Sequence, residues 1–475
     1  MVENTQTPIG DLEQLRRRLD GTLLLPDEPG YREAAETANG RYHHILPLAV
    51  AQCAGEADVV TCVQWCIEYG VQPVARGGGH SYAGFAASEG LMVDIRRLNS
   101  VSIDPATGIA TVGGSALNSD LFEKTVNTDY ILPGGTCLSV GVGGLVLGGG
   151  IGYNTRWAGL TCDHLISSRI VTAVEKEPLT IDPKHHERLF WACRGGAGGS
   201  FGINTEFTFQ LVQVPIERVA HYHFEWRGAD AAEAVLGAFD RLLPGVPPEF
   251  NAVARAQAVP LLPGEGQRDA IHVMSRGHYL GPIGELEQII QPLLAVTPTQ
   301  QLLEEKCFWD MQEHWTSGEP ESHSFGDISR YASQPLPSGV TSDFVQLLAE
   351  CPHRSDAANG SMWSLGWVGG AIVDKFSPTD TAYVHRNMST LLRPTIVWPN
   401  GEEQIGRDLQ DWADAMIAVI ADSTPNRSYQ NFPNRSLEDW QRAYYGQNLE
   451  QLVKVKATYD PDDLFNNPQS IPVSL

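Results

Sequence analysis

The chain has 475 residues, more than one hydrophobic core usually supports, so two packed domains are expected. Hydrophobic residues make up 42% and charged residues 19%, which is the balance of a folded globular protein rather than a disordered one. The net charge of −24 opposes nucleic acid and anionic membranes as partners, and it disfavours a negatively charged substrate unless a local basic pocket overrides it.

Two further classes are excluded by what the sequence lacks. No run of about 18 apolar residues occurs, and the N-terminus lacks the basic-then-apolar layout of a signal peptide, so a cytoplasmic protein is expected. The eight cysteines are scattered and show neither the paired CxxC spacing of a zinc site nor a dense disulfide framework, so no metal is expected.

The first part of the chain combines a helix with short strands. Residues 54–70 carry apolar side chains at helical spacing and predict a helix that ends at Gly70. Short β-branched runs separated by glycine clusters predict strands at VQPVARGGG, LMVDIRRL, GIATVGG, SSRIVTAV and FGINTEFTFQLV. The predicted fold class is therefore α+β, with a first domain over residues 1–213.

The sequence changes in character after Gln213. Residues 221–228, HYHFEWRG, alternate like a solvent-facing strand, and helical and proline-rich segments follow. They predict a second domain over residues 214–415, an antiparallel sheet with helices on one side. Residues 416–475 return to mixed helix and loop, and one helix is predicted over residues 438–460.

Two glycine-rich loops are the most informative part of the sequence. Nine of the nineteen residues from 134 to 152 are glycines, which implies a backbone that turns sharply and lies close to a ligand. The second loop, residues 76–81, follows a predicted strand, and its consecutive N–H groups suit a pyrophosphate, with Arg76 as a supporting cation. Neither loop contains GxGxxG, and the chain has no GxxxxGK[ST], HExxH or GxSxG, so the glycines serve another type of site.

The chain resembles the berberine-bridge-enzyme-like branch of the FAD-linked oxidases, which have the vanillyl-alcohol-oxidase fold. Six motifs in the right order carry this resemblance over nearly the whole length: RGGGHSYAG (76–84), PGGTCLSVGVGG with LGGGIGY (133–153), GLTCDHL (159–165), RLFWACRGGAGGSFGI (188–203), AYVHR (382–386) and the stretch 444–471. The resemblance implies a two-part, PCMH-type FAD-binding domain, completed by residues 416–475, and a separate substrate domain.

The resemblance further implies two covalent links to FAD, from His80 to the flavin 8-methyl carbon and from Cys137 to ring carbon C6. Taken singly, His80 could be an ordinary loop histidine and Cys137 a small buried apolar residue. Val140 lies at the family position that influences access of dioxygen, where a small residue favours an oxidase over a dehydrogenase. Further residues implied near the cofactor are Arg76, Gly77, Gly78, Gly79, Ser81, Gly135, Gly144, Gly148, Gly149, Gly152, Asp163, Gly202, Ile203 and Asn431. For Asp163, a turn or cap role is an equal alternative.

The chain departs from the family pattern at two positions. Leu145 stands where the family commonly has a histidine, and Phe432 ends a Tyr-x-Asn-Tyr motif whose last tyrosine acts as base in sugar-oxidising relatives. Tyr429 is the nearest phenol that could replace it, with a lowered pKa beside the flavin, or it could simply pack there. Tyr153 and Trp367 are further candidates for the substrate pocket, or packing aromatics.

The resemblance implies removal of a hydride from a CH–OH or hemiacetal group of a small organic substrate, a secondary metabolite or a sugar. Dioxygen would be the acceptor and hydrogen peroxide the product. The alternatives are a dehydrogenase with a non-oxygen acceptor and a catalytically silent flavin-binding protein. A monomer or homodimer is expected.

Overall fold

A computed structural model describes residues 9–315, 323–355, 360–366 and 368–475. The N-terminal part contains a four-stranded sheet in the order β1-β2-β4-β3, in which β2, β4 and β3 are parallel. Its elements are α1 (Ile9–Arg18), β1 (Thr22–Leu24), α2 (Tyr31–Ala35), β2 (Ala49–Gln52), α3 (Glu56–Tyr69), β3 (Pro73–Arg76) and β4 (Leu91–Asp94). Helix α3 buries Val59, Cys62 and Cys66 against this sheet and ends at Gly70 in a left-handed conformation, as predicted.

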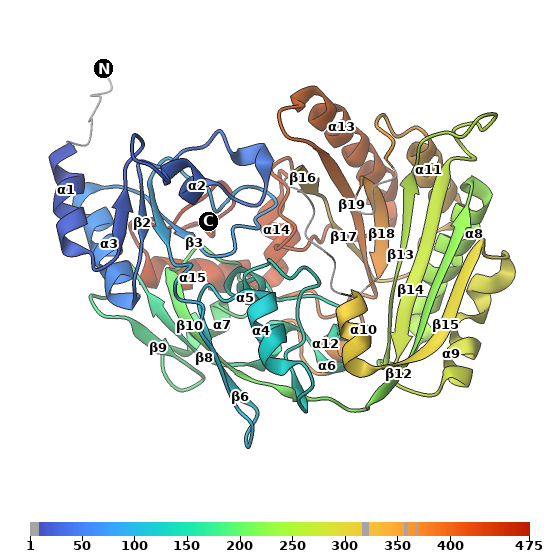
Figure 1. Cartoon of the computed structure of the whole chain (residues 1–475), viewed down its shortest axis with the longest axis horizontal. Helices are drawn as coiled ribbons and strands as arrows, with labels where there is room; N and C mark the ends of the chain where they lie inside the picture. The colour runs from blue at the N-terminus through green and yellow to red at the C-terminus, as the bar shows by residue number, and fades with distance from the viewer. Residues whose placement is uncertain (1–8, 316–322, 356–359, 367) are drawn as a thin grey trace.

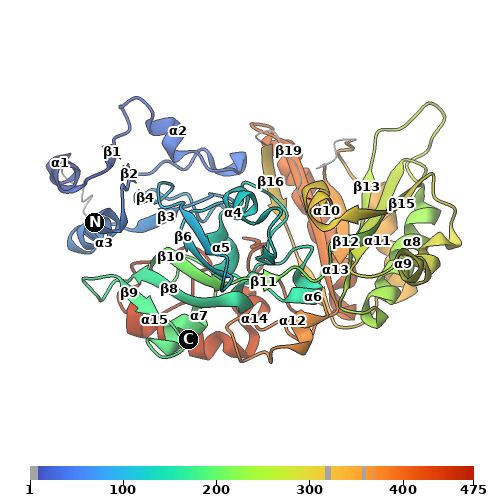
Figure 2. The same cartoon turned by 60° about the horizontal axis from the view of Figure 1, so that its bottom comes forward.

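A second, five-stranded antiparallel sheet has the order β5-β6-β10-β8-β9. The elements of this region are β5 (Val101–Asp104), β6 (Ile109–Gly113), α4 (Asn118–Thr125), β7 (Tyr130–Ile131), α5 (Val142–Leu147), α6 (Thr155–Ala158), β8 (Leu165–Val171), β9 (Leu179–Ile181), α7 (Glu187–Ala192), β10 (Ile203–Gln210) and β11 (Val212–Gln213). The five strands predicted from the first part of the sequence are present as β3, β4, β6, β8 and β10. Figure 2 shows α5 between this sheet and the large sheet that follows.

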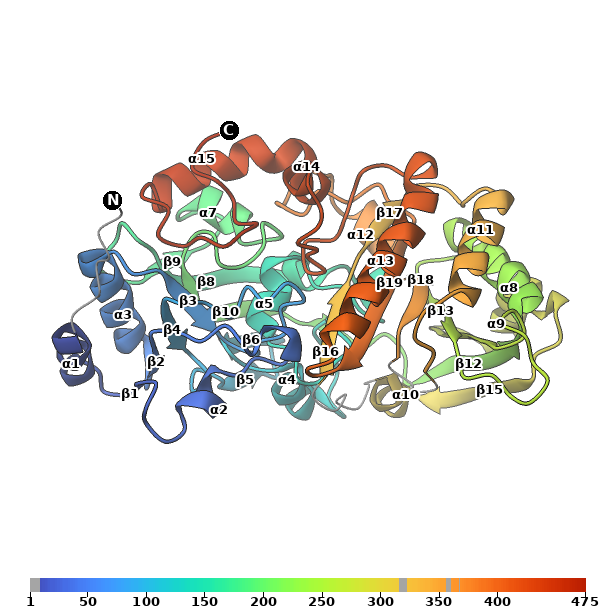
Figure 3. The ribbon, with the colours of Figure 1, turned by 90° about the horizontal axis from the view of Figure 1, so that it is seen from above.

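The large sheet is antiparallel, with the order β15-β12-β14-β13-β18-β19-β16 and β17 paired to β19. Helices α8, α9, α11 and α13 cover one face, as predicted (Figures 1 and 3). The elements are β12 (Arg218–Arg227), α8 (Ala229–Leu242), β13 (Phe250–Ala258), β14 (Ile271–Tyr279), α9 (Ile283–Ile290), β15 (Gln300–Cys307), α10 (Phe308–Trp315), β16 (His323–Asp327), β17 (Arg330–Ala332), α11 (Ser338–Ala349), β18 (Met362–Gly366), α12 (Ala371–Asp374), β19 (Thr390–Pro399) and α13 (Glu403–Ile420).

Strand β12, which includes HYHFEWRG, lies between β15 and β14, and from Tyr222 to Trp226 its side chains alternate between buried and partly exposed, as predicted. One local prediction was wrong. The single helix predicted over residues 438–460 is two helices, α14 (Trp440–Tyr445) and α15 (Leu449–Tyr459). Gly446, with φ 48°, turns the chain between them, because glycine adopts positive φ readily.

The C-terminal helices return to the N-terminal part of the molecule. Helix α15 packs beside α7, as Figure 3 shows. Lys456 of α15 is fully buried and donates to the carbonyl oxygen of Ser200 at 3.0 Å and to the carboxylate of Asp460 at 2.6 Å. Within the described residues, no helix has both the length and the apolar character required to cross a membrane.

Candidate active site

A cavity of about 330 Å³ lies where the two glycine-rich loops meet the large sheet. Its wall comes from segments far apart in the sequence: the end of β3 and the following loop, residues 135–147 including α5, residues 197–204, Arg393 of β19, residues 429–433 and residues 465–467. Thirteen of the predicted site residues line it: Gly77, Gly78, Gly79, His80, Ser81, Gly135, Cys137, Val140, Gly144, Gly202, Ile203, Tyr429 and Asn431. The fold thus brings most of the predicted residues to one place.

The two loops contact each other directly. A Cβ added to Gly78 would lie 2.4 Å from the backbone nitrogen of Gly141, so only glycine permits this approach. Beside this contact, His80 Nε2 and Ser139 Oγ share a hydrogen bond of 2.7 Å. Asn118 Nδ2 donates to the carbonyl oxygen of Cys137 at 2.9 Å and ties the cysteine segment to α4. His80 and Cys137 therefore face the same cavity from two loops that hold each other in place.

The end of the cavity near Gly77 fits the pyrophosphate of FAD. Ser115 Oγ, which is buried next to the lining residue Gly77, has no hydrogen-bond partner among the described residues and lies 3.6 Å from the Cβ position of Gly77. A Cβ placed on Gly144 would meet no atom within 4 Å, so the backbone of α5 is open to a ligand. A free hydroxyl and glycine backbone facing open space are suited to phosphate oxygens.

Arg76 supports the glycine loop from outside the cavity, contrary to its predicted place at the cofactor. Its side chain is 7% exposed and donates to the carbonyl oxygens of Gly77 and, at 3.0 Å, of Glu36. Burial, followed by the nearby Arg96 guanidinium, lowers the pKa of Arg76 to about 10. The side chain therefore fixes the loop conformation through its backbone.

Three glycines predicted at the cofactor serve close packing instead of lining the cavity. A Cβ on Gly148 would lie 2.0 Å from Asn431 Oδ1, and one on Gly152 would lie 1.6 Å from the carbonyl oxygen of Gly134. Gly149 has φ 126° and lies against Tyr383. The contact at Gly148 lets this segment approach residues 429–432, and the contact at Gly152 packs it against the start of the same glycine-rich loop.

Tyr429 is buried, and its hydroxyl oxygen accepts hydrogen bonds from the Gly150 N–H at 3.0 Å and from Asn431 Nδ2 at 3.2 Å. Burial raises the pKa of Tyr429 to about 12, although these donors act in the opposite direction. Among the protein groups, desolvation of the phenolate thus outweighs the hydrogen bonds, and a lowered pKa beside the flavin stays a prediction.

An arginine from the large sheet faces the position of the missing motif tyrosine. Arg393 Cζ lies 4.2 Å from the ring centroid of Phe432, and Arg393 forms a two-pronged ion pair with Asp327 at 2.8 and 2.5 Å. Arg393 Nη2 also donates to the hydroxyl of Tyr82 at 3.0 Å. The residues of this group, Tyr82, Asp327 and Arg393, were not among those predicted from the sequence. Tyr82 could have been predicted, because it lies two residues after His80 in the RGGGHSYAG motif.

Tyr153 lies beside the main cavity and lines a smaller one of about 70 Å³ together with Trp309 and Gln312. Its hydroxyl oxygen accepts a hydrogen bond of 3.0 Å from Arg276 Nη2. The structure thus places Tyr153 between the glycine loop and the large sheet. Trp367, the other aromatic candidate, lies outside the described residues.

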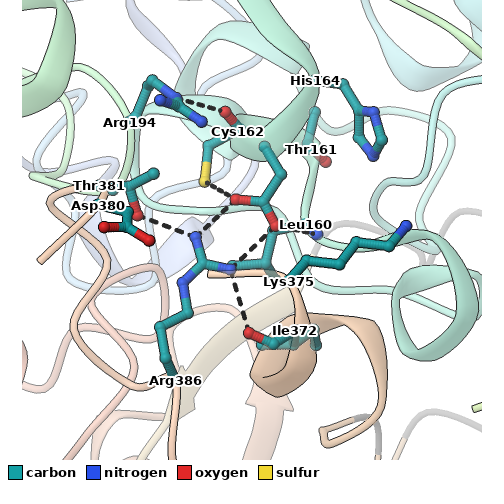
Figure 4. A network of polar contacts seen from close by, with 12 residues as sticks. Leu160, Thr161, Cys162, His164, Arg194, Ile372, Lys375, Asp380, Thr381 and Arg386 are labelled. Atoms are coloured by element: carbon teal, nitrogen blue, oxygen red, sulfur yellow. Dashed lines mark hydrogen bonds and ion pairs between the residues drawn. The ribbon is translucent and has the colours of Figure 1, made fainter. Parts of the chain in front are cut away.

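Asp163 caps a turn and forms a buried ion pair, and it does not line the cavity. Its carboxylate accepts from the Leu160 N–H at 2.9 Å, which confirms the predicted cap role. Arg386 donates to both carboxylate oxygens, at 2.6 and 2.9 Å, and both side chains are 1% exposed. Figure 4 shows Arg386 also directed at Ile372 and Thr381, so the pair joins the GLTCDHL and AYVHR motifs.

Comparison with known proteins agrees with this geometry. Two family models match the chain, the FAD binding domain over residues 47–176 and "Berberine and berberine like" over residues 428–472. The uncharacterised FAD-linked oxidoreductase YgaK of Bacillus subtilis is 30% identical over 463 residues, which cover 96% of this chain and 98% of the relative. Glucooligosaccharide oxidase of Sarocladium strictum is 28% identical over 450 residues, covering 90% and 87% of the two chains.

The fold is also found in a solved structure. BBE-like 1 of Physcomitrella patens superimposes with a TM-score of 0.85 at 24% identity, over 98% of this chain and 99% of that protein. The family models place the FAD-binding motifs and the C-terminal motif in the same segments that line the cavity. The chain therefore belongs to the berberine bridge enzyme-like family of FAD-linked oxidoreductases.

Proposed function

We propose that this enzyme is an oxidase that binds FAD covalently through His80 and Cys137. In this proposal it oxidises a CH–OH or hemiacetal group of a small organic substrate. The observation that carries the proposal is that His80 and Cys137, both potential nucleophiles, line one cavity with Val140 and the aromatic end formed by Tyr82, Tyr429 and Phe432. The name of the related glucooligosaccharide oxidase supports an oxidase that acts on alcohol groups.

Bound FAD would accept the hydride from the substrate carbon and pass its two electrons to dioxygen, giving hydrogen peroxide. The substrate CH–OH becomes C=O, and its hydroxyl proton passes to a base. The protein has to orient the CH–OH group and stabilise charge on its oxygen. Arg393 is suited to the second task, since it extends from β19 into the cavity wall beside Tyr82. Val140 in the cavity wall supports dioxygen as the acceptor, by the family resemblance.

Anaerobic addition of candidate substrates to the purified holoenzyme tests the proposal. Sugars, oligosaccharides and polyketide-like secondary alcohols are added in turn, and loss of the oxidised flavin absorbance is followed. Bleaching, then recovery with peroxide formation on admitting air, is the expected result. Bleaching without recovery in air would instead identify a dehydrogenase. If dithionite reduces the flavin but none of the alcohols bleaches it, the protein would be a catalytically silent flavin-binding protein.

Replacing Tyr429 by phenylalanine is expected to lower kcat less than about tenfold, since its raised pKa leaves it a poor base at neutral pH. Loss of the two hydrogen bonds is expected to cost about 1–3 kcal/mol of stability. The measurements are steady-state kinetics and urea unfolding of Y429F.

Y383F is a matched control, because the buried Tyr383 hydroxyl bonds Tyr331 and Tyr383 does not line the cavity. If kcat fell by about 10²–10⁴ in Y429F and not in Y383F, Tyr429 would be the base.

A further inference from the structure

The face of the large sheet that is turned away from its helices is polar. On β13, Ala252, Ala254 and Ala256 join the apolar core under the helices, while Arg255 points to the opposite face. Pairing registers place further charged residues on that face. Arg255 is opposite Ser364, and Ser364 is opposite Arg393.

A third arginine lies on the same face. Arg276 of β14 is opposite Val253, two residues along β13 from Arg255. The three half-buried side chains Arg255, Arg276 and Arg393, here called the arginine cluster, therefore come from three strands and share one sheet face. The charge of Arg255 interacts electrostatically with Tyr153 of the smaller cavity and with Cys137 of the main cavity, and Arg393 of the same cluster lines the main cavity.

The charges in the arginine cluster are not fully compensated by the described residues. Arg393 is paired with Asp327, and Arg276 donates to the hydroxyl oxygen of Tyr153. Arg255 forms no ion pair with any carboxylate in the described ranges, and its Nε is inaccessible and lacks a hydrogen-bond partner there.

Burial and then the neighbouring guanidiniums lower the pKa of Arg255, yet a guanidinium keeps its proton in proteins. A half-buried cation, whose Nε is inaccessible and without a partner in the described ranges, thus lies beside two others in a chain whose net charge is −24. An anion bound here would offset the repulsion among the three guanidiniums.

We propose that the arginine cluster binds a carboxylate of the substrate, so that the enzyme acts on an acidic alcohol rather than a neutral one. The inference rests on the proposed oxidation of a CH–OH group and adds the substrate class. A planar monoanion matches Arg255, which has no carboxylate partner in the described ranges and can donate two parallel hydrogen bonds to the oxygens of a carboxylate. The positive charge of the arginine cluster would then outweigh, within the site, the net negative charge of the protein, which by itself disfavours an acidic substrate.

Calorimetric titration of the holoenzyme tests this without requiring turnover. The probes are two pairs matched except for charge, cellobiouronic acid with cellobiose and 4-(hydroxymethyl)benzoate with its amide. In at least one pair the acid is expected to bind about tenfold or more tightly than its neutral partner, a difference of about 1.4 kcal/mol. Added salt is expected to weaken binding of the acid and to leave binding of its neutral partner unchanged.

The variant R255M is expected to reduce this preference to less than about threefold, and R255K to retain part of it. R218M is the matched control, since Arg218 is an exposed arginine at the start of β12 in the same sheet, and it should keep the full preference. Equal affinity within both pairs, failure of both acids to bind, or a preference that survives R255M would overturn the inference. The salt dependence of the wild-type protein decides the matter if R255M does not fold.

The proposed oxidation and the inferred substrate class fail separately. If neutral alcohols bleach the flavin and acids are not preferred, the proposed oxidase activity would stand and the proposed anion site would be contradicted. If acids bind in a manner that depends on Arg255 but no alcohol bleaches the flavin, the anion site would stand and the proposed oxidation would be contradicted.

Discussion

Replacing both His80 and Cys137 by alanine is expected to release nearly all of the flavin from acid-precipitated protein, whereas the wild-type precipitate stays yellow. Acid unfolding destroys the cavity, so that only a covalent bond retains the cofactor. Each single variant is expected to keep its flavin through the remaining link, because the two side chains reach the cavity from different loops. Absorbance of the supernatant and peptide mass spectrometry of the precipitate are the measurements.

The pattern of retention distinguishes the possible attachments. C307S is the control for loss of a partly exposed cysteine, since Cys307 does not line the cavity. Flavin on the His80 peptide alone would reduce the proposal to one link and imply a lower reduction potential. Free FAD from wild-type protein would contradict covalent attachment altogether.

Replacing Arg386 by methionine is expected to lower the free energy of unfolding by about 3–5 kcal/mol, because it leaves the Asp163 carboxylate buried without its cation. The same arginine bonds Thr381 and Ile372, so its loss also loosens the AYVHR segment (Figure 4). Urea unfolding monitored by tryptophan fluorescence measures the change in the midpoint.

Two further variants separate the buried ion pair from a general loss of charge. R227M removes the exposed arginine that pairs with Glu265 and is expected to cost at most about 1 kcal/mol. The double variant D163N/R386M is expected to be more stable than R386M, since it buries no unpaired charge. If R386M lowers the free energy of unfolding by less than about 1 kcal/mol, the ion pair with Arg386 is not required to stabilise the buried Asp163 carboxylate.

Local sequence signals predicted the cofactor side of the site well. The turns at Gly77–Gly79 and the glycines of residues 134–152 have local conformational requirements, which is why His80, Cys137 and Val140 could be placed at a cavity. The same signal could not separate Gly144, which faces open space, from Gly148 and Gly152, which pack against other backbone and side-chain atoms. That difference depends on Asn431, which lies outside the local pattern, and on the fold of the loop that brings Gly152 against Gly134.

The substrate side could not be predicted because it depends on strand register. Arg255, Arg276 and Arg393 are far apart in the sequence, and only the pairing of β13, β14, β18 and β19 brings them together. The effect of burial on the pKa of Tyr429 could not be read from the motif for a related reason. Its direction depends on how completely distant segments bury the ring, which the motif does not encode.

The cavity wall has a consequence for how the enzyme is made. Its lining extends from Pro73 to Asn467, and the side chain of Gln72 donates to the carbonyl oxygen of Asn466, so both ends of the chain contribute to one wall. A nascent chain on the ribosome therefore lacks part of this wall until synthesis is nearly complete. Contacts this distant in sequence also form slowly, because the intervening loop must be closed first. We therefore expect the complete flavin cavity to form only in the last stage of biogenesis, after translation.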